Sequence, residues 1–383
     1  MLDEIVPAVR NLSTRISTAL VNLLGWKTKR KLLVVESDDW GAIRMPNRLA
    51  WERLLAVNIP VDQSRYNSLD CLETCEDFQL LMNLIDNHRD CRGRPAAFTF
   101  NTVMGNPDFE AIEESGFESF KHQHLFDSYR RYHGQDLEPL WRHAIDSKLI
   151  RPQLHAREHL NSPLWMRALE SGHPETRLAF AHRFYGLKTK TGSPNQKDYL
   201  AACWADSPAD FEAICRITLE GSELFERTFG YRSKTFIACN YVWPEALEHT
   251  VSEAGVTMLQ TQRGHLQPDF QRGGCTRIRR HYTGQKNRYG QHYSVRNVLF
   301  EPYLDAEGDW VDRALSEIKQ AFLFNKPAIV CSHRINYVSS MDLKHRDRSL
   351  RQLDRLLTQV RQRWPDVEFT TSDELSDLMQ ESQ

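Results

Sequence analysis

Two adjacent carboxylates, Asp38 and Asp39, follow the apolar run Leu32–Glu36. Like charges this close raise the pKa of one carboxyl group unless a cation relieves their repulsion. A divalent cation could take one carboxylate as a ligand and leave the other free to act as a general base. The pair is therefore compatible with metal-assisted chemistry, although the dipeptide alone is more typical of a polar loop in which Asp caps a helix.

A second group of candidate ligands ends the apolar run Leu149–His155. Residues 155–159 read His-Ala-Arg-Glu-His, and this spacing would place His155 and His159 on one face of a helical turn. Histidine is the commonest protein ligand for metals, and two imidazoles with one carboxylate leave zinc an open position for water. Together with the acidic pair, this motif predicts a site for one divalent metal, with zinc preferred and cobalt or nickel as alternatives.

A third candidate, His333, ends the run Ala328–His333. A single histidine is usually structural. In a chain with a predicted metal site, a histidine that directly follows a buried run is a candidate general acid.

The elements that must position these residues are short β-type runs separated by helical stretches. Alternation of strands and helices predicts an α/β fold with a parallel sheet, either doubly wound or closed as a barrel. Each run turns polar at its C-terminal end, and in a barrel these ends meet at the face that carries the active site, which indicates an enzyme. The seven runs are Leu32–Glu36, Ala97–Asn101, Leu149–His155, Thr235–Asn240, Thr257–Thr261, Ala328–His333 and Glu368–Thr371.

The composition excludes several other classes of protein. The chain has 383 residues, and 49 Lys and Arg against 51 Asp and Glu give a net charge of −2, which argues against binding to nucleic acid. No apolar run approaches the roughly 20 residues that a membrane span needs. Eight cysteines without a CxxC pair favour reduced thiols in a cytoplasmic protein, although Cys71 and Cys75 are four residues apart and could suit a metal.

The order of the three motifs resembles the polysaccharide deacetylase family, carbohydrate esterase family 4, over roughly residues 31–375. The resemblance implies an irregular seven-stranded parallel (β/α) barrel. It assigns Asp38 as the catalytic base, His333 as the acid, and Asp39, His155 and His159 as the metal ligands. It also implies hydrolysis of the acetyl amide of an N-acetylated sugar or glycan by metal-activated water.

Four further residues are candidate contacts to the substrate. Trp310, in the dipeptide Asp309-Trp310, resembles the aromatic motif that walls the sugar pocket in this family. Asn101 and Asn240 end two of the predicted strands, and Trp243 follows the second of them.

The sequence departs from the family pattern at several points. The usual Thr-Phe-Asp-Asp-Gly is Glu-Ser-Asp-Asp-Trp-Gly here, and Ala156 stands where Ser or Thr usually follows the first histidine. The Arg-x-Pro segment is replaced by Phe-Ile-Ala-Cys-Asn-Tyr-Val-Trp-Pro, so the arginine that tunes the base is absent there, and Asn240 is its candidate replacement.

Two other functions remain open. His155 to His159 also fits the H-x-x-E-H pattern of metallopeptidases, with Glu158 as the base, although Pro163 disfavours the sustained helix which that pattern needs. Alternatively, the chain is a catalytically degenerate barrel that binds a glycan or a protein.

The domain prediction is a single barrel over residues 31–383 with insertions near 42–90, 105–145 and 262–296, preceded by an amphipathic helix within residues 1–30. We expect this helix to pack on the barrel rather than on a membrane surface. Residues 188–198 and 262–296 are predicted loops. The second is strongly basic and could bind phosphate or an acidic glycan, or form a solvated face.

Overall fold

A computed structural model of the chain describes residues 22–188 and 199–382. The helix predicted within residues 1–30 therefore lies mostly outside the described residues, as does the loop predicted at 188–198. Among the described residues, no helix has the length and apolar character needed to cross a membrane.

A curled sheet of nine strands forms the centre of the molecule, and all its pairings are parallel. The strand order β10-β7-β6-β5-β2-β1-β12-β11 leaves the sheet open between β10 and β11, and β13 pairs with the first half of β1. The α/β half-barrel confirms the predicted fold class. The strands are β1 (Lys31–Trp40), β2 (Phe98–Val103), β5 (Ile150–Ala156), β6 (Thr235–Phe236), β7 (Met258–Thr261), β10 (His292–Val295), β11 (Val298–Leu299), β12 (Ala328–His333) and β13 (Val367–Thr370).

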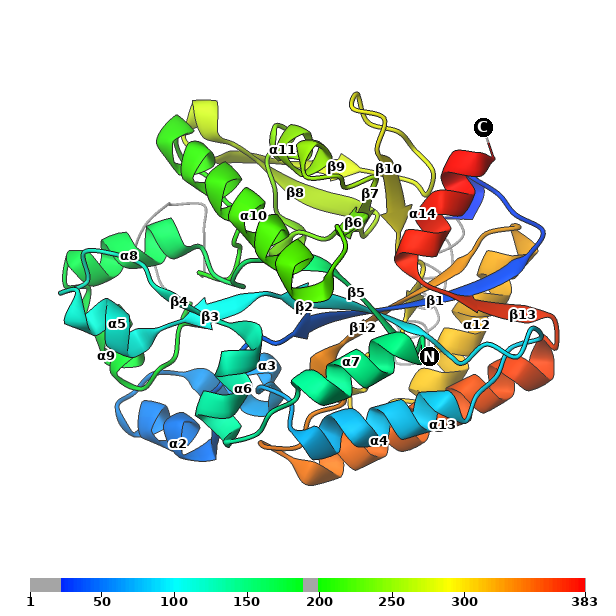
Figure 1. Ribbon diagram of the computed structural model, residues 1–383, viewed down its shortest axis with the longest axis horizontal. Helices are drawn as coiled ribbons and strands as arrows, with labels where there is room; N and C mark the ends of the chain where they lie inside the picture. The colour runs from blue at the N-terminus through cyan, green and yellow to red at the C-terminus, as the bar shows by residue number, and fades with distance from the viewer. Residues whose placement is uncertain (1–21, 189–198, 383) are drawn as a thin grey trace, which may run out of the picture.

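Helices α4, α7, α10, α11, α12 and α13 pack on the outer face of the curled sheet, where they share one apolar core with its strands. In the view of Figure 1, α4, α7 and α13 lie below the sheet, and α10 and α11 lie above it. The helices are α2 (Arg48–Ala56), α3 (Arg65–Leu69), α4 (Cys75–Asp86), α5 (Phe109–Glu114), α6 (Leu125–His133), α7 (Glu138–Asp146), α8 (Ser162–Glu170), α9 (Pro174–Ala181), α10 (Pro208–Phe229), α11 (Leu247–Glu253), α12 (Trp310–Leu323), α13 (Leu343–Arg363) and α14 (Ser372–Glu381).

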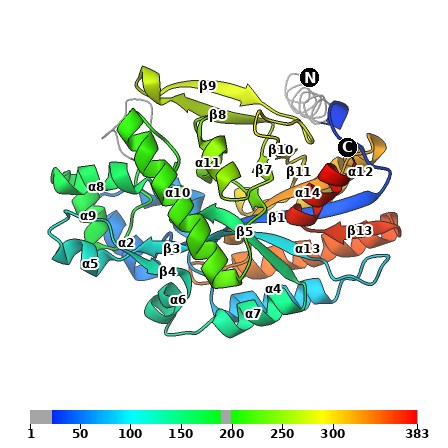
Figure 2. The same cartoon turned by 45° about the horizontal axis from the view of Figure 1, so that its top comes forward.

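The segment 262–296 is not the loop that its composition predicts. It contains an antiparallel hairpin of β8 (Gly264–Asp269) and β9 (Cys275–Arg280), which extends from the body in Figure 2, and then β10 of the central sheet. The prediction failed because the two strands of this hairpin are made mostly of polar and charged residues, a composition typical of a loop. A second small hairpin, β3 (Gly105–Pro107) with β4 (His122–His124), lies within the predicted insertion 105–145.

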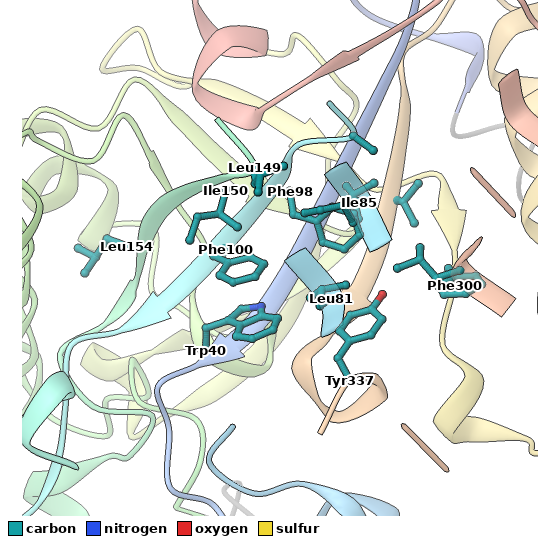
Figure 3. Packing of buried hydrophobic residues seen from close by; sticks show 14 of the residues in the cluster. Trp40, Leu81, Ile85, Phe98, Phe100, Leu149, Ile150, Leu154, Phe300 and Tyr337 are labelled. Carbon is teal, nitrogen blue, oxygen red and sulfur yellow. The ribbon is translucent and has the colours of Figure 1, made fainter. Parts of the chain in front are cut away.

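The largest apolar core lies between the sheet and the helices α4, α7 and α13 (Figure 3). Trp40, the last residue of β1, is 1% exposed and stacks on Phe100 of β2, with ring centroids 3.7 Å apart. Because the indole Nε1 also donates to Ser37 Oγ, at 2.9 Å, this ring fixes the end of β1, where the acidic pair lies.

The interior of the half-barrel is polar and hydrogen-bonded. Asn101 Nδ2 donates to Gln260 Oε1 at 2.7 Å, and Gln260 Nε2 donates to Asn101 Oδ1 at 3.0 Å and to Thr235 Oγ1 at 2.7 Å. Polar groups buried with their partners rigidify a fold. This network therefore forms a firm floor beneath the carboxyl ends of the strands.

Candidate active site

An irregularity at the end of β1 turns both aspartates toward the same space. Successive side chains of a regular strand point to opposite faces. Here the pairing of β1 with β2 shifts register between Ser37 and Trp40, and Asp39 adopts a left-handed backbone with φ of 74°. Bulges of this kind commonly re-aim side chains beside active sites. As a result Asp38 and Asp39 line one cavity.

A β-bulge in β5 positions His155, the first histidine of the motif. In the pairing of β2 with β5, Thr102 lies opposite Leu154 and Val103 opposite Ala156, so His155 is the extra residue of a bulge. His155 Nδ1 lies 2.8 Å from the carbonyl oxygen of Ile237, which can only accept, so Nδ1 carries the proton and Nε2 is free to bind a metal. Residues 157–160 form a bend, not the predicted helical turn, yet His159 still reaches the same point.

The two imidazoles and Asp39 form what we call the metal half of the site. Asp39 Oδ1 lies 3.3 Å from Nε2 of His155 and 3.2 Å from Nε2 of His159, while its Oδ2 accepts from Arg44 at 3.1 Å. Burial opposes ionisation of Asp39, but the charge of Arg44 holds the pKa of this carboxyl well below its usual value. Burial lowers the pKa of His159 well below its usual value, which favours the neutral, metal-binding form.

This donor set fits a divalent cation. Three buried side chains direct one carboxylate oxygen and two imidazole nitrogens at a common point, and all three are at most 3% exposed. Neutral imidazole and carboxylate ligands suit zinc and other first-row metals. Cys71 and Cys75 belong to no comparable cluster of three ligands among residues 22–188 and 199–382.

Asp38 occupies the other half of the site and is neutralised by Arg296. The guanidinium donates through Nη2 to Asp38 Oδ1 at 2.6 Å and through Nη1 to Oδ2 at 2.7 Å, and its Nε donates to Glu36 at 2.7 Å. Burial alone would raise the pKa of Asp38, but the Arg296 charge lowers it to about 2. Asn101 Nδ2 also donates to Asp38 Oδ1, at 2.7 Å.

His333 lies across from Asp38 and is held by a second acid. Its Nδ1 lies 2.5 Å from Glu301 Oε1, and its Nε2 lies 3.5 Å from Asp38 Oδ2. Burial would lower the pKa of His333, but the carboxylates of Glu301 and Asp38 raise it to about 9. The imidazolium form therefore predominates at neutral pH. We call Asp38, Arg296, His333 and Glu301 the acid–base half of the site.

Both halves open onto one cavity of about 440 Å³. Its walls combine aromatic rings with amides, a composition that suits an organic ligand with several polar groups. The walls beyond the two halves include Arg44, Ser64, Tyr66, Asn67, Gly186, Lys188, Leu200, Asn240, Tyr241 and Tyr303.

The four predicted substrate contacts separate into two groups. Asn240 is exposed and lines the cavity. Asn101 is fully buried beneath Asp38. Trp243 stacks on His265 with centroids 3.5 Å apart, and Trp310 Nε1 donates to the Asp305 carbonyl at 2.9 Å. The last three do not line the cavity, and each is held instead by other groups of the fold.

Glu158 is directed away from the metal half. Both its carboxylate oxygens accept from the Arg157 guanidinium, at 2.5 and 2.7 Å, and Ser162 Oγ donates to it at 2.6 Å. Glu158 is 1% exposed and does not line the cavity.

Sequence reasoning missed Arg296 and Glu301. The expected arginine is absent from residues 236–244, and Arg296 supplies a guanidinium from the crossing between β10 and β11. Arg296 lies at the end of the basic segment 262–296, which its composition predicts as a loop. The available signal was local, because Tyr-Ser-Val directly precedes it and Val-Leu-Phe follows one residue later, as expected of two buried strands.

No protein-family model matches this sequence, and no curated protein sequence matches it either. Solved structures with a similar fold include a Mycobacterium smegmatis protein provisionally assigned as a polysaccharide deacetylase, with 9% identity, a TM-score of 0.45, and coverage of 94% of this chain and 93% of that one. A Parabacteroides distasonis protein provisionally assigned as a glycoside hydrolase/deacetylase has 11% identity, a TM-score of 0.47, and coverage of 93% and 73%. The 4-α-glucanotransferase of Thermococcus litoralis has 10% identity and a TM-score of 0.43; 90% of this chain spans only 40% of that enzyme.

Proposed function

We propose that this protein is a metal-dependent hydrolase that removes the acetyl group from an N-acetylated sugar or glycan. The main evidence for the proposal is that two consecutive aspartates have different partners in the same cavity. Asp39 faces two imidazole nitrogens, whereas Asp38 faces Arg296 and His333, and both aspartates line the same cavity. Amide hydrolysis by metal-activated water can use a metal ligand set together with a separate general base and general acid.

Asp39, His155 and His159 would hold the cation. A divalent metal bound there would polarise the acetyl carbonyl and make water a stronger nucleophile at neutral pH. Zinc is the metal that this donor set favours, with cobalt and nickel as close substitutes.

Asp38 acts as the general base. Its depressed pKa keeps it ionised at every physiological pH, and Arg296 and Asn101 fix the plane of the carboxylate. One carboxylate oxygen accepts a proton from the water that attacks the acetyl carbon. The role of a positioned base of this kind is typically worth about 10²–10⁴ in rate.

His333 acts as the general acid. Because Glu301 holds Nδ1, the proton on Nε2 faces the cavity and Asp38. Nε2 donates this proton to the amide nitrogen as the C–N bond breaks, so that the products are acetate and a free amine. The raised pKa keeps the donor form populated at neutral pH.

In the metallopeptidase alternative, Glu158 would be the general base. Its carboxylate is instead hydrogen-bonded to Arg157 and Ser162, away from the metal half. The degenerate-binder alternative predicts loss of at least one catalytic group. Here a carboxylate base and an imidazole acid line the cavity, and each is paired with a charged side chain behind it.

Metal analysis and acetate release test the proposal. Protein purified without chelator should carry about one zinc-class ion per chain, and it should release acetate from N-acetylated chito-oligosaccharides. His155→Ala should lose the ion and the acetate release together. Full metal content in His155→Ala, or undiminished acetate release after exhaustive chelation, would refute the assignment.

A further inference from the structure

A cysteine lies beside the two ligand histidines, and the proposed reaction makes no use of it. The Sγ of Cys239 and one ring nitrogen each of His155 and His159 all lie within 4.8 Å of one another, and all three residues are buried. Imidazole nitrogen and cysteine sulfur are both ligands that zinc takes in proteins.

The backbone places Cys239 at this point through the same strand that orients His155. After β6, the amide of Ile237 donates to Leu154 of β5, and the carbonyl of Ile237 accepts from His155 Nδ1. Cys239 then begins a short 3₁₀ turn, Cys239–Tyr241. Ile237, two residues before Cys239, is thus joined to β5 by two hydrogen bonds, one to the Leu154 carbonyl and one from the His155 side chain.

We infer that the Cys239 thiolate is a direct ligand of the bound metal, which makes the centre a sulfur-containing site that selects zinc or cobalt over magnesium, calcium or manganese. This inference rests on the proposed function only for the existence of the metal centre. Thiolates bind borderline and soft cations in preference to the hard, oxygen-seeking ones. Binding releases the thiol proton to solvent, and thiolate and carboxylate together balance a divalent charge.

The position of the thiol leaves the reactive side of the centre accessible. Asp39, His155 and His159 line the cavity, whereas Cys239 is fully buried and does not. Sulfur therefore approaches from the protein interior, and the cavity side stays open to water and substrate.

Cobalt substitution of the full chain tests the inference. Apoprotein prepared by chelation and loaded with one equivalent of Co²⁺ should show a thiolate-to-cobalt charge-transfer band in the near ultraviolet. Cys239→Ser should lose this band and weaken zinc binding by more than about 100-fold, the upper range for loss of an outer-shell partner. The matched control is Cys203→Ser, a second buried cysteine that belongs to no ligand cluster among the described residues.

X-ray absorption of zinc-loaded wild-type protein gives a test that needs no variant. It should show a sulfur scatterer at about 2.3 Å in addition to nitrogen and oxygen at about 2.0–2.2 Å. Cobalt binding that is lost in His155→Ala shows that the histidines hold the metal. If that cobalt shows no charge-transfer band and zinc-loaded protein shows no sulfur scatterer, the role of Cys239 alone is overturned. Failure of wild-type protein to bind cobalt or zinc would overturn the metal centre as well.

Discussion

The metal half and the acid–base half of the site differ in how their charges are balanced. In the metal half, Asp39 pairs with Arg44 through Oδ2, while its Oδ1 faces the Nε2 atoms of His155 and His159. In the acid–base half, Arg296 neutralises Asp38 and Glu301 neutralises His333. The metal half therefore keeps one carboxylate oxygen and two imidazole nitrogens available to a cation, whereas each charged group of the acid–base half has a partner within the protein. Variants can therefore disrupt each half of the site separately.

The largest expected effect is on stability and follows loss of Arg296. Arg296→Met would leave the buried carboxylates of Glu36 and Asp38 without a counter-charge, and removal of one partner of such a pair typically costs about 3–5 kcal/mol. Chemical denaturation should show this loss in the free energy of unfolding. The control Arg142→Met removes a solvent-exposed pair with Glu138 and should cost below about 1 kcal/mol. Equal losses in both variants would show that the acid–base half is not held by Arg296.

The next effect separates the two aspartates by function. Asp38→Asn should retain the metal and reduce acetate release by about 10²-fold or more, because only the base is removed. Glu158→Gln should change acetate release by less than about tenfold, since its carboxylate contacts Arg157 and Ser162. The reverse order of effects would restore the peptidase hypothesis, and loss of the metal in Asp38→Asn would place Asp38 in the metal half.

The metal half could be predicted from the sequence because its residues occur in two short motifs. Asp38-Asp39 and His155 to His159 are each readable within five residues, and long-range folding only has to bring two strand ends together. The acid–base half pairs Asp38 with Arg296 and joins His333 to Glu301 across separate elements. Because these partners are far apart in the sequence, no short motif predicts their pairing, and they are identified only from the fold.

The same logic explains which fold predictions succeeded. The seven runs correspond to strands because most of their residues are buried and their outward-facing residues are apolar, even where inward-facing residues are polar. The segment 262–296 was misread, since its hairpin is exposed on one side. The bulges at Asp39 and His155 could not be predicted, because they depend on the register between strands.

A pH profile sharpens the role of Glu301 in the acid–base half. His333 must be protonated to donate, and its pKa is raised to about 9, so kcat/KM should hold at neutral pH and fall as the pH rises through about 9. Glu301→Gln removes the main stabilising charge and should move this alkaline limb down by about 1–3 pH units. Glu307→Gln, an exposed acid in the following loop, should leave the profile unchanged. An unmoved limb in Glu301→Gln would exclude His333 as the group that titrates.

The smallest expected effects separate two residues that the sequence alone presents as equal substrate contacts. Asn240 lines the cavity with a left-handed backbone, φ of 58°, whereas Trp310 donates its Nε1 proton to the Asp305 carbonyl away from the cavity. Asn240→Gly is the suitable variant, because glycine adopts this backbone without strain while the amide side chain is removed. It should raise KM for N-acetylated oligosaccharides by up to about tenfold, the loss expected for one hydrogen bond, with little change in the free energy of unfolding.

Trp310→Phe should behave in the opposite way. It keeps an aromatic ring at the start of α12 but loses the hydrogen bond to Asp305, so the free energy of unfolding should fall by about 1 kcal/mol while KM changes less than about twofold. Steady-state kinetics and denaturation of both variants, measured side by side, give the comparison. A KM increase in Trp310→Phe as large as that in Asn240→Gly would mean that the sugar reaches Trp310. The substrate site would then extend beyond the cavity between the two halves, toward α12.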